Sequence, residues 1–358
     1  MTTGAARRKS ACQGWRVGTF KARTTSGGII PPKRLRWYGA IDSGGKSMLR
    51  VAVLGVGHFG RFHAVKWAAN PDATLVGVHD LNADRAAFVA GELGVPVGSA
   101  KALIAAADAV VIAVPTRGHF ALAQAALAAG KHVFVEKPIA ATVAEAEEMI
   151  ELAAEQGVVL QVGHIERFSA AFAAVMAAPA GGRALSFEAV RAAPFRPRSL
   201  DVSVVLDLMI HDIDLVMALA GEAPSGVSAV GAAIASERPD FCVATLDFPG
   251  GRRAVITASR VSLSMERRLR VLGTEGELAV DFLARTYGVL RRGGAEPVAT
   301  MPGYGVDRGA WVDHDSLEAE QAGFLAAVRG EAPCVVPGEA GLAALRVALA
   351  VEEAVARG

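Results

Sequence analysis

The sequence predicts a doubly wound α/β domain with a parallel sheet, followed by an α+β domain with an open, mostly antiparallel sheet. Three observations support this. Apolar runs alternate with helical segments from Leu49 to about residue 166, and a glycine-rich turn follows the first run. After Arg167, strand patterns follow one another without helices between them. A chain of 358 residues is long enough for two such domains.

The first half consists of repeated β–α–β units. Its strands are apolar runs, as expected in a parallel sheet covered on both faces, and they span 50–55, 73–80, 109–114, 132–137 and 158–164. The intervening helices are marked in order by Pro71, Asn82, Gly130, a Thr142–Glu145 capping box and Gly157. Units of this kind predict a doubly wound parallel sheet.

The second half opens with a helix and continues with alternating apolar and polar residues. These strand patterns cover 184–192, 227–234, 241–248, 252–261 and 267–282, and two helices close the chain at 315–330 and 339–358. Consecutive strands without crossover helices favour an antiparallel sheet. We therefore expect domains at 48–166 and 167–358.

Residues 1–47 form a basic tail with ten Lys/Arg and one acidic residue, without helical or strand periodicity. The twin arginine in "ARRKS" is not followed by the apolar segment of an export signal. We expect the tail to be disordered, or translation to begin at Met48. The remaining residues carry 27 basic and 35 acidic side chains, which does not favour nucleic-acid binding.

Cysteine usage and hydropathy bear on the compartment. Cys12, Cys242 and Cys334 show no CxxC spacing, so we expect neither a disulfide framework nor a metal site, and we expect a reducing cytoplasm. No apolar run approaches the roughly 18 residues of a membrane span, so no membrane association is expected.

The segment "LGVGHFG" has the GxGxxG spacing of a dinucleotide-binding turn, with Gly55, Gly57 and Gly60. It follows an apolar strand, opens a helix, and precedes Asp80 at the end of the second strand. In this context the glycines let the backbone approach a pyrophosphate, and the acid binds the ribose hydroxyls. Asp80 would repel a 2′-phosphate, so NAD is predicted; Arg85 keeps NADP as an alternative.

Several polar residues follow the next strands, where ligands of open α/β sheets bind. Lys137 ends one strand in "VEKP", and "VPTRGH" ends the preceding one. In "VVLDLMIHDIDL" (204–215), Asp207, His211 and Asp214 have the i, i+4, i+7 spacing of one helical stripe on an otherwise apolar helix. Buried polar groups need partners, so this stripe is predicted to face a cleft.

Together, the GxGxxG turn, the EKP lysine and the "D-x-x-x-H-D-x-D" helix resemble the Gfo/Idh/MocA oxidoreductases over essentially all of residues 48–358. The resemblance implies a Rossmann domain, a second domain whose sheet builds a homodimer or homotetramer, and oxidation of a sugar or polyol hydroxyl. It implies that Lys137, Asp207 and His211 are catalytic, with either His211 or Lys137 as the base and with Asp207 orienting the imidazole of His211. The expected cofactor-binding residues are Gly55, Gly57, His58, Phe59, Gly60, Asp80, Pro115, Thr116, His119, Glu136 and Lys137.

A narrower resemblance, to the UDP-N-acetylglucosamine 3-dehydrogenase branch, comes from "VGHIERF" (162–168) and from residues 193–215, although "VPT" stands where the family has "TPN". It implies a UDP-sugar whose 3-keto product serves lipid A synthesis. The expected substrate-binding residues are His164, Arg167, Arg196, Arg198 and His211. Asp214 is expected to bond backbone or an arginine. The alternatives are an inositol or free-sugar dehydrogenase, an NAD-dependent glycosidase, and a non-enzymatic NAD sensor.

Overall fold

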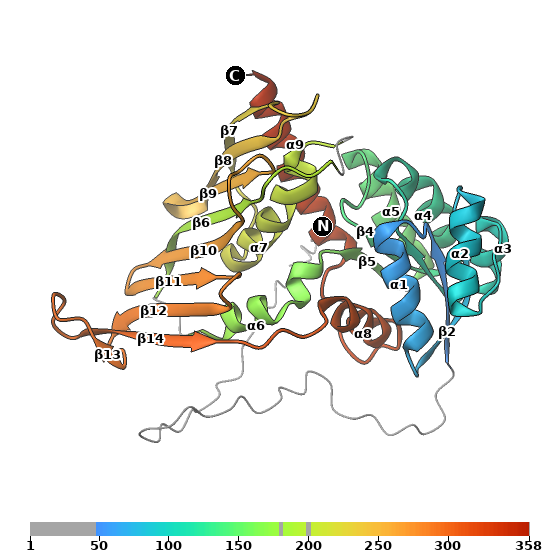
Figure 1. The fold of residues 1–358 in the computed structure, drawn as a ribbon, viewed down its shortest axis with the longest axis horizontal. Coiled ribbons are helices and arrows are strands. Elements are labelled where there is room, and N and C mark those ends of the chain that lie inside the picture. The colour runs from blue at the N-terminus through green and yellow to red at the C-terminus, as the bar shows by residue number, and fades with distance from the viewer. Residues whose placement is uncertain (1–47, 179–181, 198–201, 358) are drawn as a thin grey trace, which may run out of the picture. The chain divides into compact units, whose positions relative to one another are not determined.

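The computed structural model describes residues 48–178, 182–197 and 202–357, and Figure 1 shows their arrangement. The expectations for residues 1–47 and for Arg198 lie outside these ranges. Among the residues that the structure describes, no helix has the length and apolar character needed to cross a bilayer.

The first half is a Rossmann-type domain whose strands all pair in parallel. Its elements are β1 (Leu49–Leu54), α1 (His58–Ala69), β2 (Ala73–His79), α2 (Ala83–Leu93), α3 (Ala100–Ala106), β3 (Ala109–Ile112), α4 (His119–Ala128), β4 (His132–Glu136), α5 (Val143–Gln156) and β5 (Leu160–Gly163). Within the described residues the sheet order is β2-β1-β3-β4-β5, so the predicted doubly wound topology is confirmed. The sequence analysis predicted one helix between β2 and β3, whereas the structure has two, α2 and α3.

Helix signals in the sequence act as expected. The Thr142 side chain accepts a hydrogen bond from the backbone N–H of Glu145, and the Glu145 carboxylate accepts one from the backbone N–H of Thr142, which confirms the capping box at α5. Gly157 ends this helix in the left-handed conformation, at φ +64°. The Asn82 side chain caps α2.

The second half is built on a large sheet, and its order in the described chain is β13-β14-β12-β11-β10-β6-β9-β8-β7. Its elements are α6 (Ala170–Ala177), β6 (Ala184–Ala192), α7 (Ile210–Ala220), β7 (Gly226–Ala232), β8 (Phe241–Phe248), β9 (Arg252–Ser259), β10 (Glu266–Gly273), β11 (Gly276–Asp281), β12 (Thr286–Arg292), β13 (Glu296–Pro297), β14 (Tyr304–Ala310), α8 (Ser316–Val328) and α9 (Gly338–Arg357). In the described chain β6 and β9 pair in parallel and the other neighbouring strands of this sheet pair antiparallel, which confirms a mostly antiparallel sheet. The sequence analysis did not find β12 to β14.

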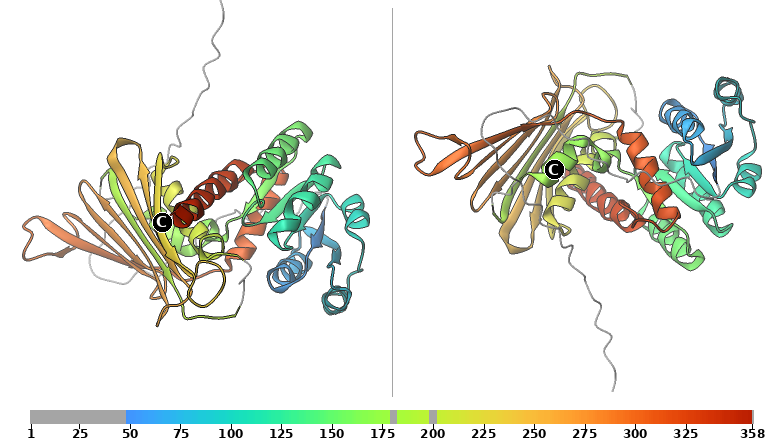
Figure 2. Two further views of the ribbon diagram at one scale, coloured as in Figure 1. Left: turned by 90° about the horizontal axis from the view of Figure 1, so that it is seen from above. Right: turned by 90° about the horizontal axis from the view of Figure 1, so that it is seen from below.

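The two closing helices pack against both halves. Figure 2 shows α9, in red, running from one face of the large sheet toward the Rossmann half. Leu342 and Leu345 of α9 belong to the core beneath the parallel sheet, whereas Val347 and Val351 belong to the core of the second half. Phe324 of α8 packs edge-on against Phe134 of the parallel sheet, with ring centroids 5.7 Å apart. The C-terminal segment therefore completes both cores.

Candidate active site

The glycine-rich turn between β1 and α1 has the shape of a phosphate cradle. Gly55 has φ +87°, and a Cβ on Gly60 would lie 1.9 Å from the Gly55 carbonyl oxygen, so neither position accommodates another residue without strain. A Cβ on Gly57 would meet no atom of the described chain within 4 Å. The backbone thus faces open space at the start of α1, where no acidic residue occupies the first turn. Unpaired N–H groups at such a helix start bind a diphosphate.

Asp80 and Arg85 brace this turn. One carboxylate oxygen of Asp80 accepts a hydrogen bond from the backbone N–H of Val56 (2.8 Å), and the other from that of Asn82 (2.9 Å). Arg85 donates to the carbonyl oxygens of Val56 (2.7 Å) and Gly57 (3.0 Å). The acid is held beside the turn, where it can reach ribose hydroxyls, so the residues present fit a bound dinucleotide.

The other cofactor candidates surround the same edge of the sheet. His58 and Phe59 are exposed at the start of α1. Pro115 and Thr116 lie where β3 ends, in a short 3₁₀ turn. His119 is buried, and its ring nitrogens lie 2.9 Å from the carbonyl oxygens of Pro138 and Val114, so it joins the loops that follow β3 and β4. The ring nitrogens of His119 therefore contact the protein backbone, and its predicted role in cofactor binding stays a prediction.

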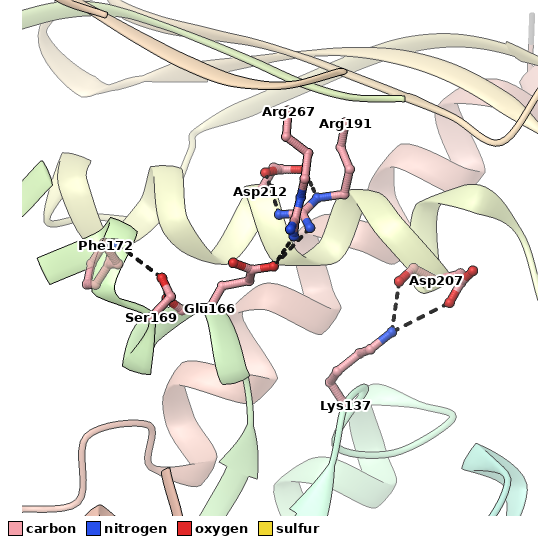
Figure 3. Close-up of polar contacts among 8 residues, drawn as sticks. All are labelled: Lys137, Glu166, Ser169, Phe172, Arg191, Asp207, Asp212 and Arg267. Atoms are coloured by element: carbon pink, nitrogen blue, oxygen red, sulfur yellow. Dashed lines mark hydrogen bonds and ion pairs between the residues drawn. The ribbon is translucent and has the colours of Figure 1, made fainter. Parts of the chain in front are cut away.

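Lys137 directly follows β4 and reaches across to the second half. Its Nζ donates to the backbone carbonyl of Asp207 at 2.8 Å and lies 3.8 Å from the Asp207 carboxylate, as Figure 3 shows. Glu136 turns the other way, and its carboxylate lies 2.7 Å from Nε2 of buried His63. The predicted lysine and aspartate are thus brought together.

The predicted helical stripe needs a correction. Residues Val205–Met209 form a π-helical turn before α7, so Asp207 and His211 are not separated by a regular α-helical turn. The physical reason is apolar packing. Val204 and Met209, and likewise Val205 and Ile210, are five residues apart and fully buried, a spacing that matches i→i+5 hydrogen bonding. Such bulges occur frequently at functional sites.

His211 has the properties of a general base. Its ring is half-buried, and within the described chain its Nδ1 is buried without a hydrogen-bond partner. Burial first, and then the nearby positive charges of Lys137 and Arg191, hold the pKa of His211 well below its usual 6.5. The imidazole is therefore neutral at neutral pH. The Asp207 carboxylate, expected to orient this ring, faces Lys137 instead.

A buried ion network that the sequence analysis missed holds α7 in place. Arg191 of β6 binds the Asp212 carboxylate through two hydrogen bonds, of 2.7 and 3.0 Å, and the Glu166 carboxylate through a third, of 2.9 Å. Arg267 of β10 also pairs with Glu166 (Figure 3). Burial alone would raise the pKa of Glu166, but the two arginines lower it below its usual value. The network positions Asp212, and hence its neighbour His211.

Arg167, Asp214 and His164 form a second buried group. Arg167 donates to both carboxylate oxygens of Asp214, at 2.6 and 2.9 Å, which confirms that Asp214 bonds an arginine. His164 is 1% exposed, and neither ring nitrogen has a hydrogen-bond partner among the described residues. Its Nδ1 lies 3.9 Å from the Asp214 carboxylate, and burial lowers the pKa of its ring.

The remaining substrate candidate is exposed. Arg196 lines a cavity of about 150 Å³ together with Asp207, Leu208 and Arg260. This cavity reaches the catalytic candidate Asp207 from the second half. Arg198, predicted beside Arg196, lies outside the described residues.

Glu320 of α8 is another group that sequence reasoning missed. It is fully buried, and within the described ranges neither carboxylate oxygen has a hydrogen-bond partner. Burial, and then the negative charge of Glu136, raise the pKa of Glu320 well above its usual 4.5. Glu320 therefore lies close enough to Glu136, at the end of β4, for the two carboxyl groups to affect one another.

Comparisons with known proteins agree with this geometry. Residues 49–164 match the family described as "Oxidoreductase family, NAD-binding Rossmann fold", and residues 162–279 match the "GFO/IDH/MocA C-terminal domain". The UDP-N-acetylglucosamine 3-dehydrogenase of Acidithiobacillus ferrooxidans is 42% identical over 311 residues, or 86% of this chain and 97% of that enzyme. The inositol 2-dehydrogenase of Rhizobium meliloti is 31% identical over 330 residues, or 86% of this chain and 97% of that enzyme.

A solved structure of the Acidithiobacillus enzyme superimposes with a TM-score of 0.79 at 40% identity, covering 87% of this chain and 98% of that one. The similarity thus extends over both halves of the fold.

Proposed function

The chain belongs to the Gfo/Idh/MocA family of oxidoreductases, and from this premise we propose that it oxidises the C3 hydroxyl of UDP-N-acetylglucosamine with NAD. Membership of this family identifies the protein as an oxidoreductase with an NAD-binding Rossmann fold. The observation that carries the proposal is the neutral imidazole of His211 beside the Lys137–Asp207 pair at the carboxyl edge of the parallel sheet. The 42% identity with the Acidithiobacillus enzyme supports the choice of substrate.

In the proposed mechanism, NAD supplies the hydride acceptor at its nicotinamide ring. His211 accepts the proton of the sugar hydroxyl on Nε2, because its Nδ1 is buried. Lys137 donates a hydrogen bond to the same oxygen as it becomes a carbonyl, and Asp207 orients the ammonium group. A neutral imidazole next to an ammonium favours His211, and not Lys137, as the base.

The diphosphate of the substrate needs positive partners. We propose Arg196, which is exposed on the cavity wall next to Asp207, together with Arg198. Arg167, the third arginine predicted, already donates to Asp214 through two hydrogen bonds and is a weaker choice.

Nicotinamide absorbance tests the function directly. The purified protein should reduce NAD to NADH in the presence of UDP-N-acetylglucosamine, when a coupled aminotransferase removes the ketone. The absorbance of NADH would then rise. Absence of turnover there, with turnover of inositol, would favour the activity named for the Rhizobium relative. Release of free sugar without net NADH would indicate a glycosidase. Tight NAD binding without any turnover would indicate a sensor.

Replacing Asp80 with alanine is expected to lower kcat/KM for NAD about 10- to 10²-fold, because a hydrogen bond to a charged group contributes about 1.5–3 kcal/mol. The preference for NAD over NADP should fall with it, since the carboxylate that repels a 2′-phosphate is gone. Steady-state kinetics with both cofactors measures this. Asp84→Asn, an exposed change in the first turn of the helix that follows Asp80, is the matched control. An unchanged cofactor ratio would contradict the assignment of NAD.

The remaining parts of the proposal concern assembly and setting. We propose a homodimer or homotetramer that forms through the uncovered face of the large sheet, where Val230 and Leu272 are 64% and 51% exposed. We also propose a cytoplasmic enzyme whose product enters lipid A synthesis.

A further inference from the structure

The least satisfied polar group near the active site is His164. Its ring is buried at the end of β5, and its two nitrogens are without hydrogen-bond partners in the described chain. An unpaired buried polar group destabilises a folded protein. The presence of such a group indicates that it forms a hydrogen bond in another state of the protein.

The neighbouring imidazole of His211 also has a nitrogen without a hydrogen-bond partner among the described residues. His211 and Asp214 lie three residues apart on α7, so their side chains share one face of the helix. His164 lies against this face, with Nδ1 3.9 Å from the Asp214 carboxylate and Nε2 on the opposite side of its ring. The charges of His164 and His211 affect one another, and Nδ1 of His211 is buried and unpaired within the described residues.

We propose that His164 is a positioning residue, whose Nε2 accepts a hydrogen bond from Nδ1–H of His211 when the cofactor is bound, while the Asp214 carboxylate accepts one from Nδ1–H of His164. This arrangement, which rests on the proposed function, fixes the His211 tautomer with its proton on Nδ1. Nε2 of His211 is then left bare to accept the hydroxyl proton. Catalytic hydrogen bonds are often long without ligands and shorten in the complex.

Two observations support this order of hydrogen bonds from Asp214 through His164 to His211. Arg167 donates to both oxygens of Asp214, so the carboxylate is held in place beside His164. Asp207, the other acid near His211, is engaged by Lys137 through both its backbone carbonyl and its carboxylate. His164 therefore takes the orienting role that the sequence had suggested for Asp207.

Nitrogen-15 NMR of the histidine-labelled full-length protein with NADH bound tests the proposal without turnover. The chain has 8 histidines, few enough to assign by substitution. His211 is expected to carry its proton on Nδ1 in the wild type and to lose this preference in His164→Leu. His164→Gln, whose amide oxygen can accept the same hydrogen bond, should restore it. His314→Leu, at an exposed histidine, is the matched control.

Kinetics provides the second measurement, on whichever sugar the wild type oxidises. His164→Leu should lower kcat about 10- to 10²-fold with unchanged NAD affinity, and His164→Gln should recover part of it. The melting temperature of His164→Leu should not fall, because leucine removes two unpaired polar atoms. An unchanged His211 tautomer, or a loss confined to the sugar KM, would overturn the proposal. Since the tautomer is read without substrate, this failure is distinct from failure of the proposed reaction.

Discussion

Replacing His211 with alanine is expected to lower kcat about 10²- to 10⁴-fold, the usual contribution of a general base, with the NAD dissociation constant unchanged. The physical reason is that burial and the charge of Lys137 keep this imidazole neutral and ready to accept a proton. Because its pKa is lowered well below 6.5, the acid limb of the wild-type pH–rate profile should lie below that pH. Stopped-flow absorbance and titration of NAD fluorescence quenching measure the two quantities.

Two comparison variants make this test specific. His314→Ala changes an exposed histidine and should keep full activity. Lys137→Ala should also lower kcat, because the developing carbonyl loses its hydrogen-bond donor. If His211→Ala stayed active while Lys137→Ala did not, Lys137 would be the base and the assignment of His211 would be wrong.

Replacing Glu320 with glutamine is expected to stabilise the fold increasingly as pH rises above 4.5. The pKa of Glu320 is raised well above that value in the folded protein, so its folding contribution is fully present below pH 4.5 and is lost as pH rises toward the folded pKa. Wild type should lose about 1.4 kcal/mol per pH unit relative to Glu320→Gln over this window.

Urea unfolding at a series of pH values measures this difference. Glu318→Gln, on the same helix but with its side chain 72% exposed, serves as the control and should change the free energy of unfolding little. Parallel pH dependence in wild type and Glu320→Gln would show that the Glu320 carboxyl is ionised in the folded state.

The fold and the central site residues were largely predictable because their signals are local. Apolar runs, the glycine spacing and the capping box each depend on a few neighbouring residues. The π-helical turn was not predictable from polar spacing alone, although the five-residue intervals of buried valine, methionine and isoleucine in 204–210 carried its signal.

The buried charges were missed because tertiary packing sets their burial. Glu320 and exposed Glu318 look alike in the sequence of α8, and only docking on the Rossmann half separates them. Arg191 did offer a signal. It alternates with Phe187 and Ala189 on the buried face of β6, and an arginine on an apolar face requires a carboxylate partner.

The placement of α9 also determines when this protein can finish folding during its synthesis. Leu342 and Leu345 fill the core beneath the parallel sheet, although they follow its strands in the chain by the whole length of the second sheet. A nascent chain that has released only the nucleotide-binding half from the ribosome therefore exposes apolar surface that its own residues cannot cover. That half must wait until α9 has been synthesised, and chaperones are the factors suited to shielding it meanwhile.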